Sequence, residues 1–151
     1  MNSYSIKEPK TSIEFDSYFK FRWKILRKPQ KQILGSEKDE FEDISYHLMV
    51  INSSNDILGV GRIHKIEKEN YAQIRYMAVS NKYQCKGLGT KILINLEQYA
   101  FKKNINKIIL HSRENAIGFY EKNGYEVIKK THILYDSIQH WMMLKNNNLN
   151  K

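Results

Sequence analysis

The sequence predicts an α/β fold of the α+β type, built on a mostly antiparallel sheet. Residues 46–51, 57–66 and 74–79 are rich in apolar and β-branched side chains, and each stretch predicts a strand. Turn-forming clusters at 52–56 and 68–70 separate them. Strands that follow one another across such short turns favour an antiparallel meander. A doubly wound nucleotide-binding fold would instead alternate strand and helix from its start.

A capped helix is predicted near the N-terminus, after a short strand at 4–6. Thr11 and Glu14 fit a capping box, in which each side chain accepts a hydrogen bond from the other residue's backbone N–H. Pro29 ends the segment, because proline cannot continue a helix. We interpret the aromatic stripe of this helix as core rather than as a binding surface. Its residues are Phe15, Tyr18, Phe19, Arg22, Trp23 and Leu26.

The second half of the chain predicts two more helices and three more strands. The helix at 90–101 has one apolar face, and the shorter one at 115–124 ends at Gly124, because glycine is common just after a helix C-terminus. The strands are 107–111, 125–130 and 139–145. We expect a single domain, 1–151, because there is no repeat or linker composition, with a disordered polar tail at 146–151.

The composition narrows the cellular setting and the partners. The chain has 151 residues, enough to bury a core. It lacks an apolar run of membrane-spanning length and begins with polar residues, so we expect a cytoplasmic protein without a membrane partner. Cys85 is the single cysteine, which argues against a disulfide framework. The net charge is +9, but the lysines are scattered, so no nucleic-acid partner is predicted, although the charge would attract an anionic cofactor.

A run of acidic residues stands out in this basic chain. Such a run is usually a solvated loop or helix face, and this is the interpretation we favour. The functional alternative is a negatively charged mouth that attracts a cationic amine. The acids are Glu37, Asp39, Glu40, Glu42 and Asp43.

The strongest local signal is the strand, glycine loop and helix within 71–100. Gly87 and Gly89 lie where the loop becomes the helix, so the backbone can bend tightly and a ligand can approach it. The N–H groups and dipole of a helix N-terminus favour phosphate, and Lys86 and Lys91 add positive charge. We interpret the loop as a diphosphate cradle.

Two common phosphate motifs do not fit this loop. A P-loop ends in Gly-Lys-Ser/Thr, whereas the order here is Gly89-Thr90-Lys91. A dinucleotide fingerprint needs a third small residue where Ile92 stands, and an acidic residue about twenty positions further on, which is also lacking.

Two motifs resemble the GNAT acetyltransferase superfamily. The first is Gln84-Cys85-Lys86-Gly87-Leu88-Gly89, of the form Gln/Arg-x-x-Gly-x-Gly/Ala, preceded by Met77-Ala78-Val79. The second, at 115–125, is Asn-Ala-x-x-Phe-Tyr-x-x-x-Gly-Tyr. The resemblance covers residues 44–130 and departs from the family at Asn81, where proline is frequent.

The resemblance implies a mixed, mostly antiparallel sheet of about six to seven strands, splayed at its centre and flanked by about four helices. It implies that the pantetheine arm of coenzyme A pairs with the backbone of Met77, Ala78 and Val79, and that Asn115 contacts the arm or the nucleotide. The Tyr120 hydroxyl would point at the thioester sulfur. The pyrophosphate would be bound by backbone N–H groups of Gln84, Cys85, Lys86, Gly87, Leu88, Gly89 and Thr90.

The implied activity is N-acetyl transfer from acetyl-CoA to a primary amine of a small molecule or peptide, with no metal. Direct attack in a ternary complex needs no enzyme nucleophile, so we do not favour an acyl intermediate on Cys85. Tyr120 is the candidate general acid, since a tyrosine hydroxyl can protonate a leaving thiolate. A catalytically silent module that binds coenzyme A is the alternative, and a homodimer is possible.

Several residues are candidates for the general base. The histidines on predicted strands are His47, His64, His111 and His140. We expect His140 first, because the last strand borders the acceptor side in the family's arrangement, and Glu42 and Asp43 second. Some relatives carry a carboxylate base on the strand that here contains Arg75, and that solution is closed to this chain if Arg75 holds the position.

Overall fold

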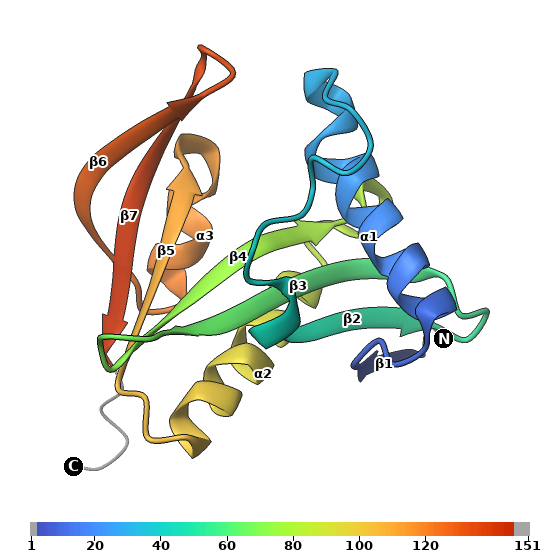
Figure 1. Ribbon diagram of the computed structural model, residues 1–151, viewed down its shortest axis with the longest axis horizontal. Coiled ribbons are helices and arrows are strands. Elements are labelled where there is room, and N and C mark those ends of the chain that lie inside the picture. The colour runs from blue at the N-terminus through green and yellow to red at the C-terminus, as the bar shows by residue number, and fades with distance from the viewer. Residues whose placement is uncertain (1–2, 147–151) are drawn as a thin grey trace.

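The computed structural model describes residues 3–146 and contains one seven-stranded sheet in the order β1-β2-β3-β4-β5-β7-β6 (Figure 1). β4 and β5 pair in parallel, and all other neighbouring strands pair antiparallel. The mixed, mostly antiparallel sheet is therefore confirmed. The strands are β1 (Tyr4–Lys7), β2 (Tyr46–Asn52), β3 (Ile57–Ile66), β4 (Tyr71–Val79), β5 (Lys107–Arg113), β6 (Glu126–Leu134) and β7 (Ile138–Asn146).

Within the described residues, three α-helices flank the sheet, one fewer than the resemblance implied. They are α1 (Ser12–Leu26), α2 (Leu88–Lys102) and α3 (Ile117–Lys122). Four short 3-10 turns join the elements: η1 (Lys28–Gln30), η2 (Glu42–Ile44), η3 (Asn81–Tyr83) and η4 (Glu114–Ala116). Residue 146 of the predicted disordered tail ends β7, and the rest of that tail, 147–151, lies outside the described residues.

α1 and α2 cover opposite faces of the sheet. Leu48 and Val50 of β2 pack in the cluster that contains α2, whereas Met49 between them packs with Tyr18 of α1. Successive strand residues point to opposite faces, so the alternation assigns each helix to its own side. The predicted capping box is present at the start of α1, where Thr11 Oγ1 accepts a hydrogen bond from the Glu14 N–H.

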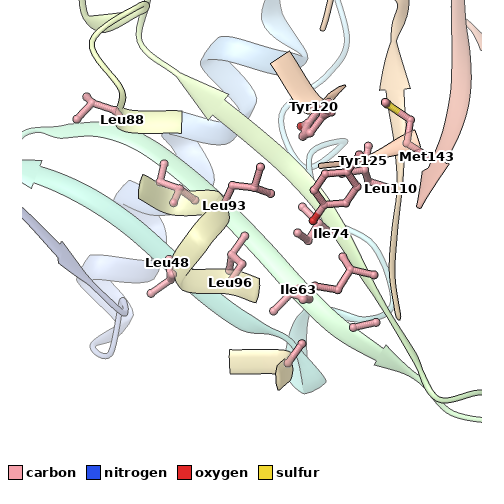
Figure 2. Packing of buried hydrophobic residues seen from close by; sticks show 14 of the residues in the cluster. Leu48, Ile63, Ile74, Leu88, Leu93, Leu96, Leu110, Tyr120, Tyr125 and Met143 are labelled. Atoms are coloured by element: carbon pink, nitrogen blue, oxygen red, sulfur yellow. The ribbon is translucent and has the colours of Figure 1, made fainter. Parts of the chain in front are cut away.

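The larger apolar core lies between α2 and the sheet (Figure 2). The helix buries Leu88, Ile92, Leu93, Leu96 and Ala100 at three- and four-residue steps. Residues of β3, β4, β5, α3 and β7 pack in the same cluster, among them Ile63, Ile74, Leu110, Tyr120 and Met143. The predicted apolar face of the helix is confirmed.

The sheet opens between β4 and β5. Their parallel pairing begins at Tyr71 and Lys107 and ends at Ile74 and Leu110, so the rest of β4 has no partner on this side. β4 also bulges: the register with β3 passes from Arg62–Arg75 to Val60–Ala78, which leaves two residues of β4 opposite one of β3. Beyond the paired region β5 continues beside β7 while β4 remains beside β3 (Figure 1). The predicted splay is confirmed.

Two residues allow this bulge. Tyr76 has φ of 58°, the left-handed region that costs a side-chain-bearing residue energy. Gly61 lies opposite, and a Cβ there would come within 2.7 Å of both Met77 Sδ and Ile92 Cγ2. Only glycine therefore lets the bulged strand and α2 pack this closely.

Candidate functional site

A cleft of about 570 Å³ lies where β4 and β5 separate. Its lining comes from the second half of β4, the end of β5 with η4, the start of the loop after β4, the end of α1, Tyr120 of α3, and the β6–β7 hairpin. The cleft therefore joins the motif-bearing segments to parts of the chain that carry no motif.

The predicted diphosphate loop connects β4 to α2. Gly87 is the N-cap of α2 and no side chain of the described residues caps it, so first-turn N–H groups stay open to a ligand. Gly87 has φ of 81°, with open space where a Cβ would stand. Gly89 has a packing role instead, because a Cβ there would lie 3.2 Å from Phe119 Cζ.

The other loop residues differ in what they expose. The side chains of Cys85 and Lys86 are exposed, and Thr90 is half-buried in the first turn of α2. Leu88 is buried in the core, so it offers only its backbone to a ligand. Gln84 lines the cleft, and its Nε2 donates to the Val79 carbonyl at 3.3 Å, which ties the loop to the end of β4.

The backbone of β4 presents free edges to the cleft. The Ser80 N–H donates to the Leu58 carbonyl at 2.8 Å, which makes these two residues a hydrogen-bonded pair. Antiparallel ladders alternate, so the peptide groups of Ala78 face β3 while those of Val79 face the cleft; Met77 lies in the bulge and has no register partner in β3. An extended ligand could pair with this edge as a strand would.

Tyr120 and Asn115 both line the cleft. Tyr120 lies in α3 and is 8% exposed, with its ring edge-on to Phe119 and Tyr125. Burial raises the pKa of the Tyr120 hydroxyl, which therefore keeps its proton at neutral pH. Asn115 lies in η4 with an exposed side chain.

Three histidines from neighbouring strands line the same cleft: His111 of β5, His132 of β6 and His140 of β7. The rings of His132 and His140 stack with centroids 4.5 Å apart, and His111 lies 5.4 Å from His132. The Nδ1–H of His140 donates to the Ile138 carbonyl at 3.0 Å, so Nε2 keeps its lone pair. Burial lowers the pKa of His140, and the imidazole is neutral at neutral pH. His132 was missed, because it lies in a segment without a motif.

The two earlier histidines are outside the cleft lining and have structural contacts. His47 pairs with the Tyr18 hydroxyl at 2.9 Å and the Glu42 carbonyl at 2.8 Å. His64 stacks on Phe41 at 4.5 Å, and burial, followed by the charge of Arg62, lowers the pKa of His64 to about 4.

The interpretation of the acidic run as a solvated face is wrong for three of its five residues. Glu37 is buried, and Asp39 and Glu42 lie beneath α1, where Arg62 donates to both, at 2.6 Å and 2.9 Å. Arg22 donates to Glu42 at 2.9 Å. Buried arginines need carboxylate partners, and the run supplies them.

The same contacts argue against the negative mouth. Asp39 and Glu42 are neutralised by three guanidinium groups, and neither lines the cleft. Because Glu42 is held in ion pairs with Arg22 and Arg62, it is not available as the general base. Asp43 is exposed on η2 and likewise does not line the cleft.

Three arginines line the cleft on the α1 side: Arg27, Arg75 and Arg113. Arg75 also donates to Asp39 at 2.8 Å. Nothing in the local sequence marks Arg27 or Arg113 as a binding residue, because each lies at the end of an element and outside both motifs. The two arginines share a site only because α1 packs near the end of β5. No local sequence pattern reveals that proximity.

Residues 3–146 contain neither a candidate metal site nor a membrane-spanning helix. No group of three or more His, Cys, Asp or Glu side chains there is arranged to hold a metal ion. No helix in the same range is long and apolar enough to cross a membrane.

Comparison with known proteins supports the motif-based interpretation. Residues 12–125 match the family model described as the acetyltransferase (GNAT) family. The uncharacterized N-acetyltransferase YjcF of Bacillus subtilis is 29% identical over 127 residues, which are 84% of this chain and 89% of that protein.

Solved structures share the fold. An acetyltransferase of the GNAT family from Staphylococcus aureus superposes with a TM-score of 0.79 at 18% identity, over 95% of this chain and 99% of that one. A Bacillus anthracis structure in complex with acetyl coenzyme A has a TM-score of 0.64 at 22% identity. That match covers 78% of this chain and 73% of the other.

Proposed function

The chain belongs to the acetyltransferase (GNAT) family, and from this premise we propose that it transfers an acetyl group from acetyl-CoA to a primary amine of a small molecule or peptide. The observation that carries the proposal is the unpaired edge of β4, which faces a cleft that also contains Tyr120. Such an edge can bind an amide-bearing arm by backbone hydrogen bonds, and the cleft holds a side chain that can donate a proton.

The residues present fit the cosubstrate. The uncapped first turn of α2 and the left-handed Gly87 form an anion-binding loop, to which the backbone N–H groups of 84–90 would contribute. The peptide groups of Met77 and Val79 would hold the pantetheine arm, with Ala78 between them pairing with β3. Asn115 lines the cleft and would make a further polar contact with the arm or the nucleotide.

We assign the role of general acid to Tyr120. Bound acetyl-CoA would supply an activated thioester, whose thiol leaving group has a pKa near 8.5. Burial raises the pKa of the Tyr120 hydroxyl, so the group is protonated when a donor is needed. A buried phenol whose pKa is shifted by burial alone can donate to a developing thiolate.

Two further roles complete the reaction. A backbone N–H of Met77 or Val79 would bind the developing oxyanion, a contribution that is large in acyl transfer. His140 would accept a proton from the attacking amine through Nε2, because its lowered pKa leaves that nitrogen unprotonated. Cys85 is given no role, since it is exposed and does not line the cleft.

Thermal melting with acetyl-CoA tests the cosubstrate, with NAD, ATP and a DNA duplex as controls. Ligand at a hundred times its dissociation constant adds about 2.7 kcal/mol to the free energy of unfolding, which raises Tm by roughly 5–10 °C for a domain of this size. We expect this rise with acetyl-CoA alone. A flat response to acetyl-CoA would refute the cradle assignment.

The Tyr120→Phe variant tests the acid. Thiol release with an accepted amine should fall by roughly 10²–10⁴-fold, while acetyl-CoA affinity by calorimetry stays unchanged. Tyr99→Phe is the matched control, because Tyr99 stacks on Tyr46 away from the cleft. Equal turnover in the two variants would remove Tyr120 from the mechanism.

The alternative is a catalytically silent module that binds coenzyme A. It predicts the same thermal shift but no thiol release with any amine. The neutral, cleft-lining Tyr120 and His140 favour the enzyme, because a silent module has no use for a proton donor and a proton acceptor beside the binding edge.

A further inference from the structure

The α1 side of the cleft is rich in positive charge. Arg27, Arg75 and Arg113 all line it, and no carboxylate of the described residues does. The histidines of the lining do not offset this charge, since an imidazole is either neutral or positive. An amine that carries only positive charge would be repelled here.

Arg27 is held in place with its charge uncompensated. It caps the C-terminus of α1, is only 8% exposed, and donates from Nε to the Ser36 carbonyl at 3.0 Å. Its guanidinium lies over the ring of Tyr76, 5.6 Å from the centroid, and 6.0 Å from that of Tyr135 in the hairpin tip. It makes no ion pair within residues 3–146.

Arg113 lines the same cleft from the end of β5. Alternation along β5 puts Leu110 in the α2 core, so Arg113, three residues later, faces α1. Burial, followed by the positive charge of Arg27, lowers the pKa of the Arg113 guanidinium. Arg113 also lacks an ion-pair partner in the described part of the chain.

Arg75 provides the contrast. It lies on β4 and donates one hydrogen bond to Asp39, so it has a carboxylate partner. Arg22 and Arg62, deeper under α1, also have carboxylate partners. Among the arginines of this region in the described residues, only Arg27 and Arg113 have none.

The two uncompensated arginines do not belong to the predicted diphosphate loop. That loop opens α2, which covers the opposite face of the sheet from α1. Two neighbouring guanidinium groups at a half-buried site favour an oxyanion, which both can bind by charge-assisted hydrogen bonds.

We propose that the acceptor is a primary amine that also bears an oxyanion, a carboxylate or a phosphate, which binds between Arg27 and Arg113. This inference rests on the proposed acetyl transfer and specifies its acceptor class. It replaces the cationic acceptor that the acidic run had suggested.

Matched pairs of amines test the inference by melting of the coenzyme A complex at constant ionic strength. O-phosphoethanolamine is compared with ethanolamine, and lysine with cadaverine; inorganic phosphate and acetate are the simplest anions. We expect a higher Tm with the oxyanion-bearing member of at least one pair than with its partner. Which pair responds distinguishes phosphate from carboxylate.

The Arg113→Gln variant makes the test specific. The oxyanion-dependent rise in Tm should disappear, and kcat/KM for the oxyanion-bearing amine should fall roughly 10- to 100-fold, with little change for its partner. Lys20→Gln removes one exposed charge of α1 and is the matched control. Arg27→Lys, which keeps the charge, should lose less than Arg113→Gln.

Three results would overturn the inference: ethanolamine or cadaverine preferred over its partner, no oxyanion effect in the wild-type protein, or an unchanged preference in Arg113→Gln. Each leaves acetyl transfer itself standing if acetyl-CoA still raises Tm. Absence of that rise points instead to failure of the proposed function.

Discussion

On the α2 face of the sheet, aliphatic side chains fill the core, whereas on the α1 face Arg22 and Arg62 are fully buried beside Asp39 and Glu42. The α2 face is stabilised by close packing and by the removal of apolar surface from water. The α1 face depends on charge balance, because each buried ion is costly unless its partner stays in place. The cleft lies between the two faces, with the predicted diphosphate loop on the α2 side and Arg27, Arg75 and Arg113 on the α1 side.

This difference has a functional consequence. Asp39 beneath α1 forms ion pairs with both Arg62 and Arg75. The cleft-lining Arg75 is therefore positioned by this buried ionic layer. An aliphatic layer could not present oriented guanidinium groups to a ligand. Stability on the α1 face and acceptor recognition should therefore respond to the same conditions, while the aliphatic contacts of the α2 face, unlike its Glu97–Lys145 ion pair, should be indifferent to them.

The largest effect is expected from breaking the ionic layer at its centre. Arg62→Met removes the guanidinium that binds both Asp39 and Glu42 and leaves each carboxylate with one arginine, Arg75 or Arg22, which should lower the free energy of unfolding by about 4 kcal/mol. Urea denaturation at pH 7 measures it. Arg62→Lys, which keeps the positive charge, should lose less, and equal losses in Arg62→Lys and Arg62→Met would contradict the charge argument.

Leu96→Ala is the matching change on the α2 face. Leu96 is fully buried, and its truncation leaves a cavity that should cost about 3 kcal/mol. The cost should be the same at low and neutral pH and in high salt, because no charge is involved. A pH-dependent cost would show that the two faces are not independent.

The two faces also differ in how much the sequence revealed. The α2 helix and its buried residues follow from a local apolar period, and the glycine loop before it from two glycines two positions apart, so both elements could be predicted. On the α1 face, the charged Arg22 within an aromatic stripe was the one sign of a buried charge. Its partner Glu42, however, lies twenty positions away in the sequence. Contacts of that kind leave no periodic trace in a single sequence.

The cleft-lining residues of the α1 side were not predicted from the sequence, for the same reason. Arg27 ends a helix, Arg113 ends a strand and His132 lies in a segment without a motif, so each alone looks like an ordinary surface residue. Only the antiparallel pairing of β5 with β7 and the packing of α1 bring them together. The splay itself was predictable only through the family resemblance, because it depends on where two strands stop pairing.

A titration of stability with pH sharpens the comparison. Burial would raise the pKa of Asp39, but hydrogen bonds and charge from Arg62, the Phe41 N–H and Arg75 lower it from 3.8 to about 2. The stabilisation is therefore complete above about pH 4 and is lost as the pH falls toward 2. The stability gap between wild type and Asp39→Asn should narrow by about 2 kcal/mol over that window.

Glu14→Gln is the control for that titration. The pKa of Glu14 is also lowered to about 2, chiefly by its hydrogen bond from Lys7, but the residue is at the surface. Its contribution should be largely removed in 1 M salt, whereas that of Asp39 should persist, because salt screens exposed charges far more than buried ones. Equal screening of the two would contradict a buried ionic layer.

The smallest expected effect comes from the start of α1, outside both layers. Thr11→Ala removes the acceptor for the Glu14 N–H, a bond of 3.1 Å, and should cost about 1 kcal/mol by urea denaturation. Thr11→Ser should restore most of it, because the hydroxyl is kept. The cost should add to that of Leu96→Ala within about 0.5 kcal/mol, since the two residues share no contact across the sheet. A clear departure from additivity would show that the anchoring of α1 on one face is coupled to the apolar core on the other.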